Sequence, residues 1–148
     1  MYNVIIASLN TLLGLSLICI SSYKVGPEEA VIQISEIRSA KGNIIIQVYR
    51  DEIGYEHQQP YKQFTFSKTN INAGAMTVKF PIDAGKYGLT LLDDENSNGK
   101  MDKNFIGMPK EGFGFSDFFM ETLKKPKFEQ FQIDIKKTKK IAIRIKYI

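Results

Sequence analysis

Short segments in which apolar and polar residues alternate recur along this chain, and they limit what it can fold into. The clearest segment is the last one, residues 140–148, where every second residue from Ile141 to Tyr147 is apolar. This period gives a β-strand one buried and one solvated face, whereas an amphipathic helix needs apolar residues three or four positions apart. The alternation therefore predicts a fold built from paired strands.

Further segments of this kind are separated by residues typical of turns, and the chain contains no persuasive helical segment. They are residues 30–37, 44–49, 64–66, 75–80, 87–92 and 127–135. About seven short strands with turn signals between them predict an all-β fold, an antiparallel β-sandwich. Because Gly42 and Asn43 form a turn signal between the first two segments, we expect those two strands to pair.

The sequence pattern at the N-terminus predicts a targeting segment. Residues 4–20 are almost wholly apolar, small residues follow at 21 and 22, and the first charged side chain is Lys24. We interpret residues 1–22 as a signal peptide, with a retained anchor helix or a lipoprotein acylated at Cys19 as alternatives. Residues 23–148 then form a single β-sandwich domain located in the periplasm or secreted. Membrane contact is expected only if the leader is retained.

Composition excludes several kinds of chemistry from that domain. Cys19 is the only cysteine and His57 the only histidine, so a disulfide, a thiolate metal site and a multi-histidine site are all excluded there. The formal net charge of +4 is spread along the chain and is not concentrated with aromatic residues, so nucleic-acid binding is not expected.

The acidic segment 93–105 carries the most distinctive pattern. Side-chain oxygens recur at every second position from residue 94 to 98, glycine follows at 99, and a carboxylate lies at 102. This is the spacing of a calcium loop, since alternate residues of a tight loop point inward and a hard cation needs six to eight oxygens. The predicted metal ligands are Asp94, Asn96, Asn98, Asp102 and the backbone carbonyl of Lys100.

The pattern departs from an EF-hand in two ways. Phe105 occupies the twelfth position, where an EF-hand has a bidentate Glu, and a strand rather than a helix precedes the loop. We therefore expect weak affinity, with a Kd of roughly 10⁻⁴–10⁻³ M, and a site that Glu111 or Asp117 could complete. The alternative is a plain polar connection between strands, because Asn and Gly suit tight turns.

Residues 107–119 are rich in glycine and phenylalanine. They could form an aromatic platform for a ligand, or a long loop fastened to the core by its own phenylalanines. We favour the loop, because Phe lacks the polar handle that sugar-binding aromatics use.

Four segments together resemble one known family. They are residues 42–49, the turn from Pro81 to Tyr87, the acidic segment 93–104 and residues 107–116. The chain is similar over residues 31–148 to the exported bacterial domain-of-unknown-function family numbered 2141. This resemblance implies a secreted or periplasmic β-sandwich, similar to immunoglobulin-like and transthyretin-like modules, and it implies no activity.

These observations predict an exported, non-catalytic binding or interaction module, with a possible Ca²⁺ loop at residues 94–102 and a protein or glycan partner at the cell envelope. One alternative is a hydrolase that uses carboxylates among Asp93, Asp94, Glu111 and Asp117. Because no nucleophile or oxyanion-hole motif accompanies them, we do not expect an enzyme. Another alternative, a carrier of a small apolar ligand, rests on analogy of fold.

Overall fold

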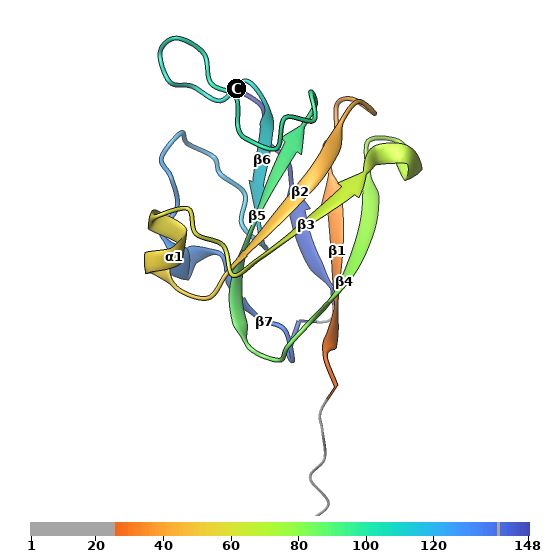
Figure 1. Ribbon diagram of the computed structural model, residues 1–148, viewed down its shortest axis with the longest axis vertical. Helices are drawn as coiled ribbons and strands as arrows, with labels where there is room; N and C mark the ends of the chain where they lie inside the picture. Colours follow the sequence, from red (N-terminus) through yellow and green to blue (C-terminus); the bar gives the residue numbers. More distant parts are fainter. Residues whose placement is uncertain (1–25, 139) are drawn as a thin grey trace, which may run out of the picture.

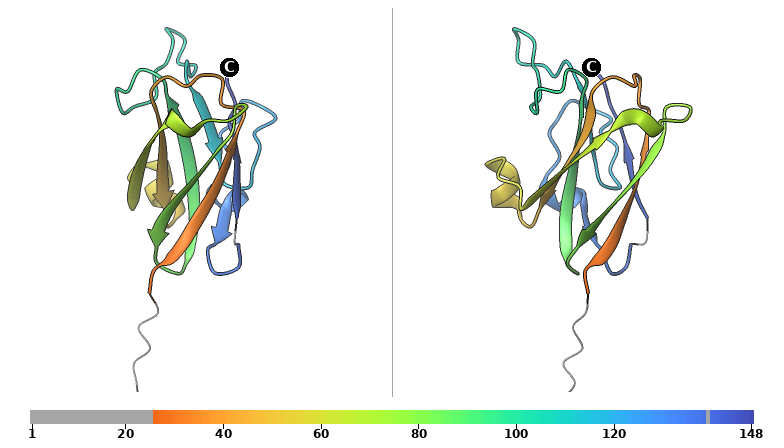
Figure 2. Two further views of the ribbon diagram at one scale, coloured as in Figure 1. Left: turned by 90° about the vertical axis from the view of Figure 1, so that its right-hand side faces the viewer. Right: turned by 45° about the vertical axis from the view of Figure 1, so that its right-hand side comes forward.

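A computed structural model describes residues 26–138 and 140–148, so the predicted leader lies outside the described residues (Figure 1). The chain is mostly β, with eight strands in two sheets that face each other as two layers (Figure 2). The predicted two-sheet β fold is confirmed. Within the described residues, every helix is too short or too polar to cross a bilayer.

The first sheet has three strands, in the order β4 (Met76–Ile82), β1 (Glu28–Ser35) and β8 (Ile141–Arg144). β1 runs antiparallel to β4 but parallel to β8, so the sandwich is not wholly antiparallel. The expected pairing of the first two strand segments is wrong, because the turn at 40–43 carries the chain from this sheet into the other one. Alternation specifies which face of a strand is buried, not which strand lies beside it.

The second sheet is built on a long central strand, β5 (Lys86–Asp94). On one side lies β2 (Asn43–Tyr49), followed by β3 (Lys62–Ser67). On the other side β7 (Gln132–Asp134) pairs with the start of β5, and β6 (Gly112–Phe115) pairs with its end. β5 therefore delivers the chain to the acidic segment at one end of the sandwich.

The main core fills the space between the two sheets. Ile44, Leu89 and Ile143 come from three different strands and are fully shielded from solvent. Gly112 and Gly114 of β6 face this core, where an added Cβ would lie 2.5 Å from Ile145 and 2.6 Å from Ile143 respectively. The segment expected to be a loop over residues 107–119 thus contains a strand whose glycines permit close packing against the C-terminal segment.

A smaller apolar cluster covers the outer face of the second sheet. Its buried members are Tyr49, Tyr55, Phe115, Met120, Phe128 and Phe131. Two of them come from short helical segments that the sequence pattern did not indicate, α1 (Glu52–Glu56) and η2 (Phe128–Gln130); a third, η1 (Lys68–Asn70), follows β3. The expected strand over 127–135 is therefore reduced to β7.

Candidate functional site

The acidic loop begins where β5 ends. Asp94 is the last residue of the strand, and its carboxylate turns into the loop that follows. Asp94 Oδ1 accepts a hydrogen bond from the backbone N–H of Asn98 (3.0 Å), and Oδ2 accepts one from Gly99 (2.8 Å). Gly99 has a φ of +78°, a left-handed conformation that glycine adopts without strain. Local backbone donors therefore set the shape of the loop.

The structure brings together the four side chains predicted as ligands. Asp102 accepts hydrogen bonds from the side-chain amides of Asn96 (2.6 Å) and Asn98 (3.1 Å). Asn96 Oδ1 accepts from the same Asn98 N–H that Asp94 binds, at 3.1 Å. Lys100 joins the group through its backbone N–H, which donates to Asn98 Oδ1 at 2.9 Å. These residues form one hydrogen-bonded cluster.

The cluster offers two carboxylates and two amides for a hard cation. Among the residues that the structure describes, no three acidic, histidine or cysteine side chains gather closely enough to hold an ion. A cation would therefore need amide and backbone oxygens. Because the Asn96 and Asn98 amides present N–H groups to Asp102, both would have to turn for their oxygens to coordinate an ion.

Glu111 holds the base of the loop. The residue is 5 % exposed, and its two carboxylate oxygens accept hydrogen bonds from the N–H groups of Glu95 (3.0 Å) and Asp102 (3.1 Å). It therefore clamps the two ends of the loop together. The second distant candidate, Asp117, instead accepts from the N–H of Ala142 on β8 at 2.8 Å.

A buried ionic network lies directly beneath the loop. Lys68 and Asp93 form an ion pair in which both side chains are fully buried, and the Tyr147 hydroxyl donates to the other oxygen of Asp93. Lys68 also donates to the carbonyl of Ser39 at 3.2 Å. Burial and the hydrogen bond to Asp93 raise the pKa of Tyr147 well above its ordinary value, so its hydroxyl remains a donor. Sequence reasoning missed Lys68, because a lysine in a polar turn looks solvated.

Arg38 connects the network to the surface of the loop. Its guanidinium makes two hydrogen bonds to Glu95, at 2.6 and 3.0 Å, and lies 4.2 Å from the ring centroid of Tyr147. The hydrogen bond from Arg38 holds the pKa of Glu95 below its ordinary value despite partial desolvation, and the same contact raises the pKa of Arg38. Glu95 therefore already has a cationic partner.

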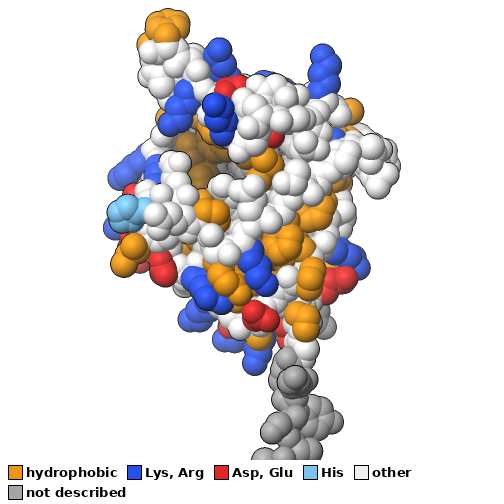
Figure 3. All heavy atoms as spheres, in the orientation of Figure 1, with side chains coloured by type: hydrophobic (Ala, Val, Ile, Leu, Met, Phe, Trp, Pro, Cys, Tyr) orange, Lys and Arg blue, Asp and Glu red, His pale blue; other side chains and the backbone are white. Residues whose placement is uncertain are grey.

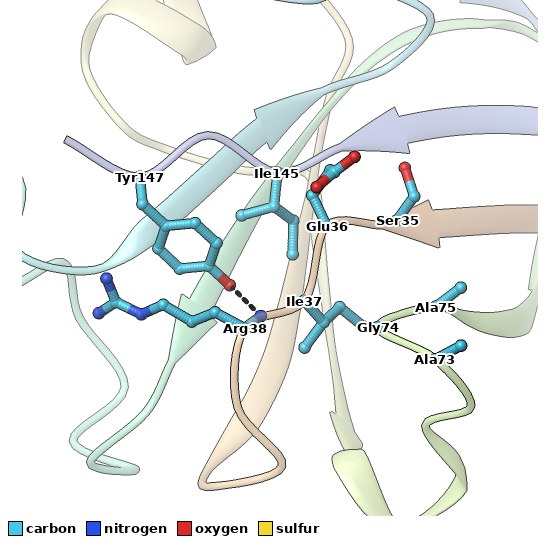
Figure 4. Close-up of a pocket in the computed structure, with 9 residues that line it drawn as sticks. All are labelled: Ser35, Glu36, Ile37, Arg38, Ala73, Gly74, Ala75, Ile145 and Tyr147. Carbon is cyan, nitrogen blue, oxygen red and sulfur yellow. Dashed lines mark hydrogen bonds between the residues drawn. The ribbon is translucent and has the colours of Figure 1, made fainter.

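A shallow cleft of about 390 Å³ lies beside this network, between the end of β1, the turn at 73–75 and the C-terminal segment (Figure 4). Its polar side chains are those of Ser35, Glu36, Arg38 and Tyr147. The Tyr147 hydroxyl accepts from the backbone N–H of Arg38 at 3.2 Å and donates to Asp93. These two bonds hold the Tyr147 hydroxyl in place.

One family model, described as "Uncharacterized protein conserved in bacteria (DUF2141)", matches residues 32–143. The match includes the second half of β1, most of β8, all the strands between them and the whole acidic loop. No curated protein and no solved structure matches the chain significantly. The resemblance read from the sequence is confirmed: the chain belongs to the DUF2141 family of bacterial proteins.

Proposed function

We propose that this protein is an exported, non-catalytic β-sandwich module whose loop at residues 94–102 binds Ca²⁺ weakly. The observation that carries the proposal is the meeting of Asp94, Asn96, Asn98 and Asp102 in one cluster at the end of β5. The ion would be structural and would hold the loop in a fixed shape for a protein or glycan partner at the cell envelope.

The ion pairs around the loop support the assignment of a cation site. Arg38 neutralises Glu95, whereas no ion pair to Asp94 or Asp102 is found in the described part of the chain. Ca²⁺ would supply the missing positive charge between these two carboxylates. Because the bidentate Glu of an EF-hand is replaced by Phe105, the expected Kd is roughly 10⁻⁴–10⁻³ M, which suits the calcium concentrations met outside a cell.

The carboxylates considered for hydrolysis have structural partners. Asp93 is paired with Lys68, Asp94 binds backbone N–H groups, and Glu111 clamps the loop. A general acid and base need two such groups directed at one substrate-sized space. These contacts favour a module without catalytic activity over a hydrolase.

A carrier of a small apolar ligand is the second candidate. Figure 3 shows a hollow with hydrophobic side chains in its floor, between α1 and the projecting acidic segment. The neighbouring apolar cluster is filled by its own aromatic rings, such as those of Tyr55 and Phe131, which lie 4.9 Å apart between centroids. This packing leaves the calcium-stabilised module as the better-supported function.

Thermal unfolding in calcium and in a chelator tests the proposal. Calcium at about ten times Kd should stabilise the native protein by about 1.4 kcal/mol relative to EDTA. Asp102→Asn should abolish this difference, because it removes one of the two ligand charges. Asp83→Asn, an exposed aspartate in the β4–β5 turn, should retain it. Identical wild-type curves in calcium and EDTA would refute the metal assignment.

A further inference from the structure

Residues 102–110 form a finger that projects from the end of the sandwich and carries apolar side chains at its tip (Figures 1 and 3). Phe105 is 99 % exposed and Ile106 is 68 % exposed. Phe105 is more exposed than any other large apolar side chain in the described ranges. Such exposure of neighbouring apolar residues usually marks an interaction surface.

The finger has a defined shape. Its two arms are joined by hydrogen bonds from Asn104 N to Met108 O and from Lys110 N to Asp102 O, both 2.8 Å. At the tip, Asn104 Oδ1 accepts from the N–H groups of Ile106 (3.1 Å) and Met108 (2.9 Å). The backbone therefore directs Phe105 and Ile106 away from the domain, so these side chains cannot reach its core.

Exposed positive charge surrounds this apolar tip. Lys100, Lys103 and Lys110 are all exposed and belong to the finger or to the loop that leads into it. The nearby carboxylates of Asp102 and Glu111 bind amide and backbone N–H groups, and among the described residues neither forms an ion pair with these lysines. The finger thus combines an apolar end with exposed lysines behind it.

We propose that the finger inserts Phe105 and Ile106 into the interfacial region of a lipid bilayer that carries anionic headgroups. A bilayer accepts a convex apolar tip without a complementary groove, and its anionic headgroups attract lysines placed just behind that tip. Two apolar side chains and three lysines give reversible binding. This contact requires neither the leader nor Ca²⁺. The sequence had suggested a membrane association through the leader alone.

A tryptophan reporter provides the first test, because the chain contains no tryptophan. Phe105→Trp should show a blue-shifted emission when vesicles of equimolar phosphatidylcholine and phosphatidylglycerol are added in EDTA. Vesicles of phosphatidylcholine alone should produce a smaller shift. Ile53→Trp is the matched control, since Ile53 is 72 % exposed on α1, away from the finger. Its emission should not change with either vesicle.

Vesicle co-sedimentation of the untagged protein in EDTA provides the second test. Phe105→Ser and Lys103→Glu should each weaken partitioning onto the mixed vesicles by about tenfold. Ile53→Ser and Lys86→Glu should leave partitioning unchanged. None of the four substitutions should lower the thermal unfolding midpoint appreciably, because all four residues are exposed at the surface.

Three results would overturn the proposal. The first is an unshifted emission of the Phe105→Trp variant with mixed vesicles. The second is equal partitioning of Phe105→Ser and wild type onto those vesicles. The third is that neither protein binds vesicles, while the wild type forms a concentration-dependent dimer that Phe105→Ser abolishes. The last result would show that the tip docks on a second copy of the chain.

Discussion

Asp93 and Asp94 are adjacent in the sequence, yet they lie in two contrasting regions at the same end of the sandwich. Strand alternation directs Asp93 into the core, where Lys68 and Tyr147 bind its carboxylate. Asp94 instead turns into the acidic loop, where backbone N–H groups bind it. The chain's own cation neutralises the inner carboxylate, whereas no ion pair among the described residues includes the outer one, which is also buried, at 1 % exposed.

The largest loss of stability is expected from a substitution in the inner region, around Asp93. Lys68→Met should destabilise the protein by about 3–5 kcal/mol, because it leaves the Asp93 carboxylate buried without a cation. Urea unfolding measures the difference. Lys79→Met is the matched control, since Lys79 forms an exposed ion pair with Glu29 and should change stability by less than about 1 kcal/mol.

Removing both buried charges tests whether the stability lost in Lys68→Met comes from the unpaired charge or from altered packing. The double variant Lys68→Met/Asp93→Asn should recover much of the lost stability, because no uncompensated charge remains in the core. A Lys68→Met variant as stable as wild type would show that the inner carboxylate does not depend on its cation.

An intermediate effect is expected where the two regions meet. Glu111→Gln replaces one carboxylate oxygen with an N–H₂ group, so the N–H of either Glu95 or Asp102 loses its acceptor. The expected loss of unfolding free energy is about 1–3 kcal/mol, measured by urea unfolding in EDTA. Glu121→Gln, at an exposed position, should have no measurable effect. An unaltered Glu111→Gln variant would mean that the clamp does not hold the loop.

The smallest loss of stability is expected from breaking the surface ion pair between Arg38 and Glu95. Because Arg38 lowers the pKa of Glu95, this pair contributes stability above the ordinary pKa of a glutamate, and the contribution is lost as the pH falls through the lowered value. Arg38→Met should cost about 0.2–1 kcal/mol at neutral pH and less in acid. Thermal unfolding at several pH values measures how the loss caused by Arg38→Met depends on pH. The same substitution in a Glu95→Gln background, which lacks the titrating group, is the control. An equal loss in the Glu95→Gln background would contradict the assignment.

Part of this architecture follows from the sequence. Alternation placed Ile141 and Ile143 on a buried face, and the spacing of oxygen-bearing residues selected the Asp94–Asp102 loop. Those signals are local, because they depend on which way consecutive side chains point. The pairing of β1 with β4 and β8 is not local, and the turn at 40–43 indicated the wrong partner.

The remaining features depend on contacts between distant segments. Glu111 binds the backbone of Glu95, and Lys68 reaches Asp93 from the turn after β3. Neither contact has a spacing rule that could be recognised in advance. Phe105 was noticed only as a residue that replaces a calcium ligand, and its exposure at the tip of a projecting finger became visible only with the fold.

The cation site proposed at residues 94–102 can be tested directly in solution. A calcium titration followed by two-dimensional ¹H–¹⁵N NMR tests it residue by residue. Ca²⁺ binding there should produce saturable shifts in the backbone amides of Asn98, Gly99 and Asp102 and in the side-chain amides of Asn96 and Asn98, with little change at Ile44 or Ile143 in the core. Unchanged loop amides at millimolar calcium, or shifts spread evenly over the surface, would contradict it.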